Sequence, residues 1–346
     1  MAAAPTKLKI GCYRYHHTEA LFNGTVKVRL DAAGCTDVGS ALEVEFLSDH
    51  LPSDIFRRMV KDREFDAAEL GWTFYLRTLE MYDEPPFIAI PIFPNRNFRH
   101  SAIYVNDSIK EPKDLIGKTI GEFGLYGHDA GVWPKGILSD EYGVKPDQCK
   151  WLLGASDWRM PPFEWISHPH PSDVDVRPSP NNDPLGPMLE NGEISAFISA
   201  VAPKCYLNGS AKVRRLFTNY EEVERDYYRR TGIFPIMHTV VVRRDLLKKH
   251  PGLAKAIYKA FCDAKDITMK DINYRYMEQH MQFSMPWITP LYERNSETFG
   301  DADWWPYGIE KNKKAVDTFL RYFHEQGLST KRWTCEEIFC PELLDT

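Results

Sequence analysis

Two stretches of the chain, Phe98-Arg-His-Ser-Ala-Ile-Tyr-Val105 and Met237-His-Thr-Val-Val-Val242, decide the expected fold. Both contain strand-like runs, and strand-like and helical runs alternate along the whole sequence around them. Such alternation is typical of α/β proteins with mostly parallel sheets. If the chain crosses between two α/β blocks at these stretches, its first and last parts form one lobe and its middle forms the other. We therefore expect a two-lobed protein with a ligand cleft between the lobes.

The expected elements follow from hydrophobic periodicity. Strands are predicted at Lys7–Cys12, Glu43–Leu47, Phe65–Leu70, Phe87–Phe93, Ala102–Val105, Thr119–Glu122, Ser195–Ala200 and Met237–Val242. Helices are predicted at Ser53–Asp62, with Ser53 as its cap after Pro52, and at Asp129–Tyr142, Asp245–Ile272 and Glu310–Gln326. Residues Met160–Pro187 hold eight prolines in 28 positions, which predicts a long irregular loop.

The composition narrows the classes of function. The chain has 346 residues, enough for about two domains, and 43 basic and 49 acidic residues give a net charge of −6. Because both signs are mixed along the chain, no basic face for nucleic acid is expected. Apolar runs such as Phe87–Phe93 are far shorter than the roughly 20 residues of a membrane span. We therefore expect a protein that binds neither nucleic acid nor a membrane.

Cysteine usage and the N-terminus predict the compartment. The seven cysteines are odd in number and scattered, and they include no Cys-x-x-Cys pair. That pattern is typical of reduced, packed thiols rather than a disulfide framework or a zinc ribbon. The first residues, Met1-Ala-Ala-Ala-Pro-Thr6, lack a charged region followed by an apolar one, as a secretion signal would have. We expect a cytoplasmic protein.

Ligands of α/β folds bind beyond the carboxyl ends of the strands, which selects the candidate site. The strand-end segments are Tyr13–His17, Glu69–Trp72, Phe123–His128 and Ser199–Ala202. The two crossing segments, at Arg99-His-Ser101 and Met237-His-Thr239, are expected to border the same cleft.

Several stretches of the sequence resemble one known family. They are Arg63-Glu-Phe-Asp-Ala-Ala-Glu-Leu70, Pro91-Ile-Phe-Pro94, Phe98–Val105, Gly136-Ile-Leu-Ser-Asp-Glu-Tyr-Gly-Val144, Tyr227-Tyr-Arg-Arg-Thr-Gly-Ile-Phe-Pro-Ile-Met-His-Thr-Val-Val241, Trp305-Pro-Tyr-Gly308 and His324-Glu-Gln-Gly-Leu328. The chain resembles the 4,5-dihydroxyphthalate decarboxylases, relatives of the type II periplasmic binding proteins. The family tends to carry an arginine just after the first strand, where this chain has Tyr15-His-His-Thr18.

The resemblance implies a fold and an activity. The fold is an α/β, two-lobed, periplasmic-binding-protein-like (type II) fold, with lobe 1 built from 1–98 plus 239–346 and lobe 2 from 99–238. The activity is decarboxylation of a hydroxylated aromatic carboxylic acid without a cofactor, similar to the conversion of 4,5-dihydroxyphthalate to 3,4-dihydroxybenzoate and carbon dioxide. A hydroxyl para or ortho to the carboxylate lets the ring accept a proton and then expel carbon dioxide. The protein must supply a proton donor, a carboxylate clamp and a partly dry pocket.

Three residues are predicted to be catalytic. His238 is the first choice for the general acid, because histidine titrates near working pH and this one ends a buried-looking run at a crossing. His100 follows Arg99, and an Arg–His pair there would bind a carboxylate and relay a proton. Glu69 is placed to accept the phenolic proton or to orient a histidine. The structural alternatives are a core histidine for His238, a surface arginine beside a structural His100, and a helix cap for Glu69.

The residues predicted to bind the substrate come from the same segments. They are Arg99, Ser101, His17, Trp72, Tyr126 and His128. Trp72 would be a flat aromatic wall, although a core tryptophan fits the sequence equally well. The glycine-rich bend Gly121–His128 precedes a helix, so its backbone N–H groups are candidates for binding a carboxylate.

The sequence predicts no metal and no cofactor. His16-His17 and His168-Pro-His170 are the histidine pairs that suggest a metal, but neither has the spacing of a known zinc motif, and adjacent histidines on a strand point in opposite directions. The sequence also lacks the Gly-x-Ser-x-Gly elbow that is typical of serine hydrolases.

Two other functions stay open. One is a non-catalytic protein of the same fold that binds a small aromatic acid, and the other is an enzyme acting on a different aromatic or pyrimidine-like substrate. In each case the expected partner is a small molecule. The sequence is compatible with a homo-oligomer and does not give the oligomeric state.

Overall fold

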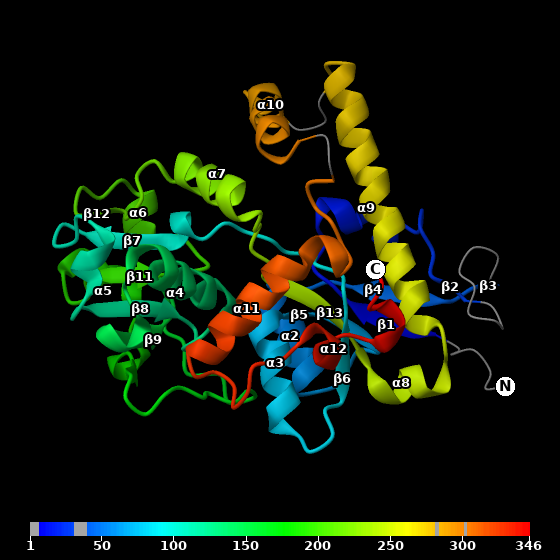
Figure 1. The fold of residues 1–346 in the computed structure, drawn as a ribbon, viewed down its shortest axis with the longest axis horizontal. Helices are drawn as coiled ribbons and strands as arrows, with labels where there is room; N and C mark the ends of the chain where they lie inside the picture. Colours follow the sequence, from blue (N-terminus) through cyan, green and yellow to red (C-terminus); the bar gives the residue numbers. More distant parts are fainter. Residues whose placement is uncertain (1–6, 31–39, 281–283, 301–302) are drawn as a thin grey trace.

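The computed structural model describes residues 7–30, 40–280, 284–300 and 303–346, and its strands form two main sheets (Figure 1). The first sheet has the order β4 (Val44–Leu47), β1 (Leu8–Gly11), β5 (Ala67–Gly71), β13 (His238–Arg243) and β6 (Phe87–Ile90). The second has the order β10 (Asp175–Pro178), β9 (Lys150–Gly154), β8 (Thr119–Phe123), β11 (Ala196–Ile198), β7 (Ile103–Asn106) and β12 (Val213–Arg215). A short pair, β2 (Arg29–Leu30) and β3 (Ser40–Ala41), lies apart from both.

Both sheets are mixed, but in each of them all the described strands except one run in the same direction, which agrees with the expectation of mostly parallel sheets. β1 is parallel to β4 and β5, and β8, β9, β10 and β11 are parallel to their neighbours in that group. The antiparallel strands include β7 and β13, each of which directly follows a crossing between the sheets. A strand that begins at a crossing enters its sheet from the side where the parallel strands end, so it runs in the opposite direction.

Helices cover the two sheets. They are α1 (Glu19–Phe22), α2 (Pro52–Val60), α3 (Trp72–Met81), α4 (Asp129–Tyr142), α5 (Leu185–Asn191), α6 (Lys204–Leu207), α7 (Tyr220–Thr231), α8 (Arg244–Lys249), α9 (Leu253–Met277), α10 (Ile288–Phe299), α11 (Lys313–Glu325) and α12 (Cys335–Ile338). Short 3₁₀ turns lie at His16–Thr18, His100–Ala102, Pro112–Leu115, Pro146–Gln148, Pro180–Asn182, Glu310–Asn312 and Pro341–Leu343. No helix within the described ranges is both long enough and apolar enough to cross a membrane.

Three predicted elements need correction. Ser53 does not cap its helix, because α2 already begins at Pro52 with Leu51 as the cap residue. The helix expected at 245–272 is two helices, since Pro251 and the left-handed Gly252 (φ 82°) lie between α8 and α9. The loop expected at 160–187 contains β10 and the beginning of α5.

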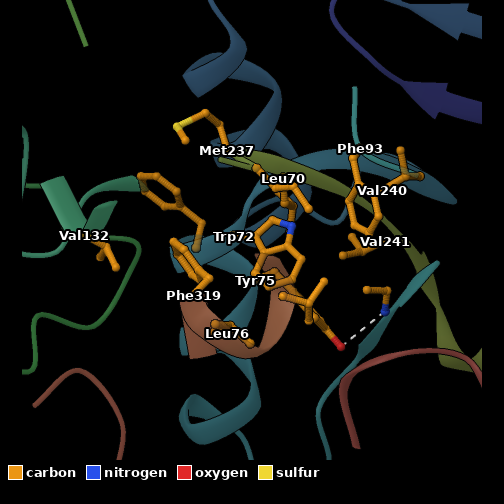
Figure 2. Close-up of a cluster of buried hydrophobic side chains, with 14 of the residues drawn as sticks. Leu70, Trp72, Tyr75, Leu76, Phe93, Val132, Met237, Val240, Val241 and Phe319 are labelled. Carbon is orange, nitrogen blue, oxygen red and sulfur yellow. Dashed lines mark hydrogen bonds between the residues drawn. The ribbon is translucent and has the colours of Figure 1, made fainter. Parts of the chain in front are cut away.

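A cluster of buried aromatic side chains joins the two halves of the molecule (Figure 2). Trp72, at the start of α3, packs edge to face on Phe319 of α11, with ring centroids 5.1 Å apart. Trp133 of α4 packs on the same Phe319 ring, with centroids 5.6 Å apart, and its indole N–H donates to the carbonyl of Ile236 at 2.9 Å. Because α11 contributes to the packing of both α3 and α4, the hydrophobic core is continuous between the sheets.

The strands divide between the sheets by position in the chain. Those of the first sheet come from residues 8–90 and 238–243, and those of the second come from residues 103–215. This distribution supports the predicted division into 1–98 plus 239–346 and 99–238, which stays a prediction.

Candidate active site

The candidate site begins where β5 and β13 lie side by side. In the antiparallel register, His238 lies opposite Gly71 and Glu69 lies opposite Val240. Residues two apart on one strand point to the same face of a sheet, so the Glu69 and His238 side chains meet diagonally. The His238 Nδ1 and Glu69 Oε1 atoms are 2.6 Å apart.

The Glu69 carboxylate is fully buried and accepts hydrogen bonds at both oxygens. Oε1 accepts from the Tyr15 hydroxyl at 2.6 Å, and Oε2 accepts from the Tyr13 backbone N–H at 2.8 Å and from the Cys12 thiol at 3.5 Å. Burial raises the pKa of this carboxyl, but the hydrogen bond and charge of His238, followed by Tyr15, outweigh it and hold the pKa below its ordinary value. Glu69 is therefore ionised, and it orients His238.

A hydrogen bond from Nδ1–H of His238 to a carboxylate has a chemical consequence for the ring. It fixes Nδ1 as the donor and leaves Nε2 as the nitrogen available to a ligand. The Phe56 ring of α2 packs edge to face on the His238 ring at 5.1 Å and limits its rotation. Glu69 does not cap α3, whose cap residue is Gly71, so this alternative for Glu69 is excluded.

The segment after β1 completes the polar network. The Asn95 amide donates to the Tyr15 hydroxyl at 3.2 Å, and the rings of Tyr15 and His17 are stacked at 5.3 Å. Burial lowers the pKa of His17 to about 4, and its buried Nε2 has no hydrogen-bond partner among the described residues. The structure therefore places neutral His17 beside the Glu69 network, where the sequence predicted a substrate-binding residue.

Arg99 supplies a cation next to this network. Its guanidinium Nε donates to the sulfur of Met237, the residue before His238, at 3.1 Å. The side chain is nine-tenths buried, and that burial lowers its pKa to about 10, although the charges of Asp129 and Glu224 act in the opposite direction. Arg99 is still charged at neutral pH, and in the described part of the chain no carboxylate hydrogen-bonds to it. A buried guanidinium in that state is suited to a carboxylate ligand.

The N-terminus of α4, a helix that follows β8 of the second sheet, contacts the candidate site. Asp129 Oδ1 accepts from the backbone N–H of Thr73 in α3 at 2.7 Å, while Oδ2 lies against Gly71 and has no hydrogen-bond partner among the described residues. Burial raises the pKa of Asp129. The neighbouring His128 caps α4 through Nδ1, which accepts from Ala130 N–H at 3.1 Å. Burial, and then the charge of Arg99, lower the His128 pKa to about 3.

Sequence reasoning missed Asp129, Tyr15 and Asn95. Asp129 directly follows the glycine-rich bend at the start of a predicted helix, which was the available signal. A carboxylate that contacts the first turn of a helix in the other half of the protein cannot be recognised from local sequence. Tyr15 belongs to the segment Tyr13–His17 that the sequence assigned to the cleft, whereas Asn95 lies outside all the assigned segments.

The structure places three of the predicted residues elsewhere. His100 lies between Phe217 and Tyr227, with ring centroids at 5.4 and 5.2 Å, and neither ring nitrogen has a partner among the described residues. Burial lowers its pKa to about 4. Trp72 is 1% exposed and belongs to the core of Figure 2, which favours the core alternative over an aromatic wall.

Tyr126 also points away from Glu69 and His238. Its ring packs on the Nζ of Lys135 at 3.6 Å and on Trp151 at 5.8 Å, beside a cavity of about 530 Å³ lined by α4 and α11. The Ser101 backbone N–H donates to Glu224 at 2.8 Å, so this residue is tied to α7.

The glycine-rich bend does not offer all its N–H groups to a ligand. The Gly127 N–H donates to Glu122 at 3.0 Å, and the buried Glu122 also binds Lys135 at 2.7 Å. The Glu122 side chain therefore accepts a hydrogen bond from the Gly127 N–H that the sequence offered to a substrate carboxylate.

The histidine pairs considered as a metal site have other local surroundings in the structure. His16 and His17 form a 3₁₀ turn rather than a strand, so the predicted alternation is wrong. The rings of His168 and His170 contact backbone carbonyls of Phe163 and Pro171 at 2.7 and 2.9 Å. Within the described ranges, no three His, Cys, Asp or Glu side chains gather as a metal site would require.

Comparison with known proteins finds both sequence relatives and structural neighbours. The sequence is 34% identical over 300 residues to a 4,5-dihydroxyphthalate decarboxylase of Comamonas testosteroni, covering 85% of this chain and 88% of that protein. It is also 34% identical over 183 residues to a 4,5-dihydroxyphthalate decarboxylase of Pseudomonas putida, covering 51% of this chain and 69% of that protein. No family model matches the sequence.

The structural neighbours concern the fold alone. The periplasmic aliphatic sulphonate binding protein SsuA of Escherichia coli superimposes with a TM-score of 0.52 at 11% identity, covering 99% of this chain and 100% of that one. A sulfonate-binding SsuA protein of Methylobacillus flagellatus KT gives 0.54 at 15% identity, covering 98% and 92%. The predicted α/β, periplasmic-binding-protein-like fold is confirmed.

Proposed function

This chain belongs to the 4,5-dihydroxyphthalate decarboxylase family, and from that membership we propose that it decarboxylates a hydroxylated aromatic carboxylic acid without a cofactor. The proposed reaction is like that of 4,5-dihydroxyphthalate giving 3,4-dihydroxybenzoate and carbon dioxide. The observation that carries the proposal is the 2.6 Å hydrogen bond between His238 Nδ1 and Glu69, beside the buried Arg99. It combines an oriented proton donor with a cation for an acidic substrate.

The reaction needs one proton for each carbon dioxide released. His238, protonated and oriented by Glu69, donates the proton at Nε2 to the ring carbon that bears the carboxylate. A phenolate oxygen para or ortho to that carbon, ionised by loss of its proton to solvent, supplies the electrons, so the ring becomes a dienone. The C–C bond to the carboxylate then breaks, its electron pair returns to the ring, and carbon dioxide leaves. Solvent reprotonates His238 for the next turnover.

The remaining residues are assigned to binding. Arg99 binds a carboxylate with its planar fork, and the neutral rings of His17 and His128 border the site without adding positive charge. The hydrogen bond of Glu69 to Nδ1 holds the His238 ring so that Nε2 is the nitrogen available to the substrate. We keep Ser101 as a predicted contact through its side chain.

The deciding experiment uses the purified protein and a panel of hydroxybenzoates and hydroxyphthalates. We expect the ultraviolet spectrum of at least one dihydroxylated phthalate to change with time, together with stoichiometric release of carbon dioxide. Binding of the acids with no release of carbon dioxide would instead support the second candidate, a non-catalytic aromatic-acid-binding protein. That candidate rests on the neighbours that bind sulfonates.

The cytoplasm is the compartment we propose. Six cysteines lie within the described residues, and all six are free, including the close pair Cys335 and Cys340. Free thiols suit a reducing compartment. We propose a small aromatic acid as the partner and keep a homo-oligomer as a prediction.

A further inference from the structure

Residues 158–165, called here the strap, lie on the binding edge of the second sheet. The neighbouring parallel strands β8, β9 and β11 end at Phe123, Gly154 and Ile198. Loops that leave the carboxyl ends of parallel strands form the binding edge of α/β sheets. The strap begins four residues after β9 ends, so topology alone puts its first residue, Trp158, at this edge.

The far end of the strap is attached to the other half of the molecule. Trp165 stacks on Phe74 of α3, with centroids 5.4 Å apart and planes 17° apart. Phe163 packs on the same Phe74 ring at 6.2 Å and on Trp165 at 5.6 Å. In Figure 1 the green connection after β9 runs along the lower side of the view toward α3. The strap therefore spans from the second sheet to a helix of the first.

Aromatic contacts connect the strap to the candidate site. The His128 ring lies between Phe74 and Phe123, with centroids at 5.7 and 5.5 Å. Trp158 packs edge to face on Phe123 at 6.0 Å. His128 directly precedes Asp129, whose carboxylate lies against Gly71, the residue paired with His238, so this aromatic group borders the candidate site.

Trp158 differs from the other members of this group in its exposure. Phe74 is fully buried and Phe163 and Trp165 are partly buried, whereas Trp158 is 43% exposed. A large aromatic side chain that keeps a free surface at a binding edge is suited to packing against another ring.

We propose that Trp158 is a specificity-determining residue that packs against the aromatic ring of the substrate while Arg99 binds its carboxylate. The inference rests on the proposed function, because it takes the substrate to be an aromatic acid. The strap holds Trp158 in place through the contacts of Phe163 and Trp165 with Phe74. Trp72, for which the sequence left an aromatic wall and a core position equally open, is replaced in this role by Trp158 of the strap.

The test compares Trp158→Ala, Trp158→Phe and a matched control, Trp287→Ala. An aromatic contact of this kind is worth about 3- to 10-fold in affinity. We expect Trp158→Ala to raise KM for the aromatic acid by about that factor with kcat within about twofold, and Trp158→Phe to restore most of the loss. Trp287 is 83% exposed at the start of α10, and its replacement should change neither parameter. An unchanged KM in Trp158→Ala overturns the inference.

A binding measurement separates this inference from the proposed function. Kd for 4,5-dihydroxyphthalate and for the non-aromatic cyclohexane-1,2-dicarboxylate is measured by calorimetry in the Trp158→Ala and wild-type proteins. We expect a weaker Kd for the aromatic acid alone. Equal weakening for both acids, or for neither, overturns the role of Trp158. Absence of turnover in the wild type, with the aromatic-specific loss of binding retained, overturns the decarboxylase and leaves Trp158 as a ring-binding residue.

Discussion

His238 and His100 both lie where the chain crosses between the two sheets, but one contacts a carboxylate and the other lies between aromatic rings. His238 is hydrogen-bonded to the buried carboxylate of Glu69 and is followed by a strand of the first sheet. His100 lies in a pocket of aromatic rings, and its nitrogens have no hydrogen-bond partner among the described residues. Two similar sequence positions thus produce one histidine that a carboxylate orients and one that burial among aromatic rings keeps neutral.

The comparison shows that burial alone does not make a histidine catalytic. Both rings are more than nine-tenths buried. At His100 burial disfavours the charged form with little to compensate, so the pKa falls to about 4. At His238 the buried Glu69 carboxylate lies 2.6 Å from Nδ1 and orients the ring. The partner, more than the position in the chain, decides the chemistry.

The largest expected effect is on His238. His238→Ala should lower kcat by roughly 10²–10⁴-fold, the usual contribution of general acid catalysis, with little change in substrate Kd. Steady-state kinetics and calorimetric binding measure the two quantities. His100→Ala, the matched control at the other crossing, should keep kcat within about threefold.

The result that would break the comparison is the reverse pattern. Near-normal kcat in folded His238→Ala, together with a large loss in His100→Ala, would exchange the two roles. If thermal melts show that His238→Ala is unfolded, Glu69→Gln is the second variant, because it keeps the volume and removes the negative charge that lies 2.6 Å from His238 Nδ1. It should lower kcat with little change in substrate Kd.

Arg99 tests the binding half of the site. Arg99→Ala removes a buried partner of the substrate carboxylate, so KM should rise by an amount equivalent to about 2–4 kcal/mol, with a smaller change in kcat. Arg99→Lys should recover only part of the loss, because an ammonium lacks the planar fork. Kinetics with a benzoate and a phthalate that carry the same hydroxyls would show which carboxylate it binds. Equal KM for wild type and Arg99→Ala contradicts the assignment.

The neutral state of His100 predicts a dependence of stability on pH. Its pKa is about 4 in the folded protein and about 6.5 when exposed, so the unfolded chain binds more protons between these values. Stability should therefore be complete above pH 6.5 and fall as the pH drops toward 4. His100→Phe should reduce that loss by about 1–3 kcal/mol near pH 4.

Urea titrations of wild type and His100→Phe at pH 7.5 and pH 4.5 measure this difference. An identical loss in both proteins would show that His100 is already charged at neutral pH or does not titrate differently on folding. That outcome would remove the contrast between the two histidines.

The smallest expected effect is that of a chelator. The proposed electron sink is the hydroxylated ring itself, so exhaustive treatment with EDTA followed by dialysis should leave kcat unchanged. Loss of turnover that a divalent ion restores would mean that His17 or His238 must be reassigned as a metal ligand.

The sequence predicted the fold and part of the site, and the failures have physical reasons. Strand-end reasoning selected Glu69, His17 and His128, because parallel strands end at a common edge whatever their distance in the chain, and the two crossing segments selected Arg99 and His238. Their roles at the site stay predictions. The strand-end reasoning also selected Trp72 and Tyr126, but the Trp72 side chain lies in the hydrophobic core and the Tyr126 ring packs on Lys135.

Whether such a residue faces a ligand or the core depends on which helix packs next to it. For Trp72 that helix is α11, about 240 residues later in the chain. Asp129 and the strap were missed for the same reason, since their partners, Thr73 and Phe74, lie in the other half of the molecule.

The position of β13 in the first sheet has a consequence for synthesis on the ribosome. β13 lies between β5 and β6, so residues 8–90 cannot complete their sheet until residue 243 has been made. At about 5–20 residues per second, the wait from residue 90 is on the order of 8–30 seconds. The second sheet draws its strands from one continuous stretch and has no such wait. During that interval the nascent chain exposes the unpaired edges of β5 and β6, and chaperones that bind unpaired strands have their opportunity there.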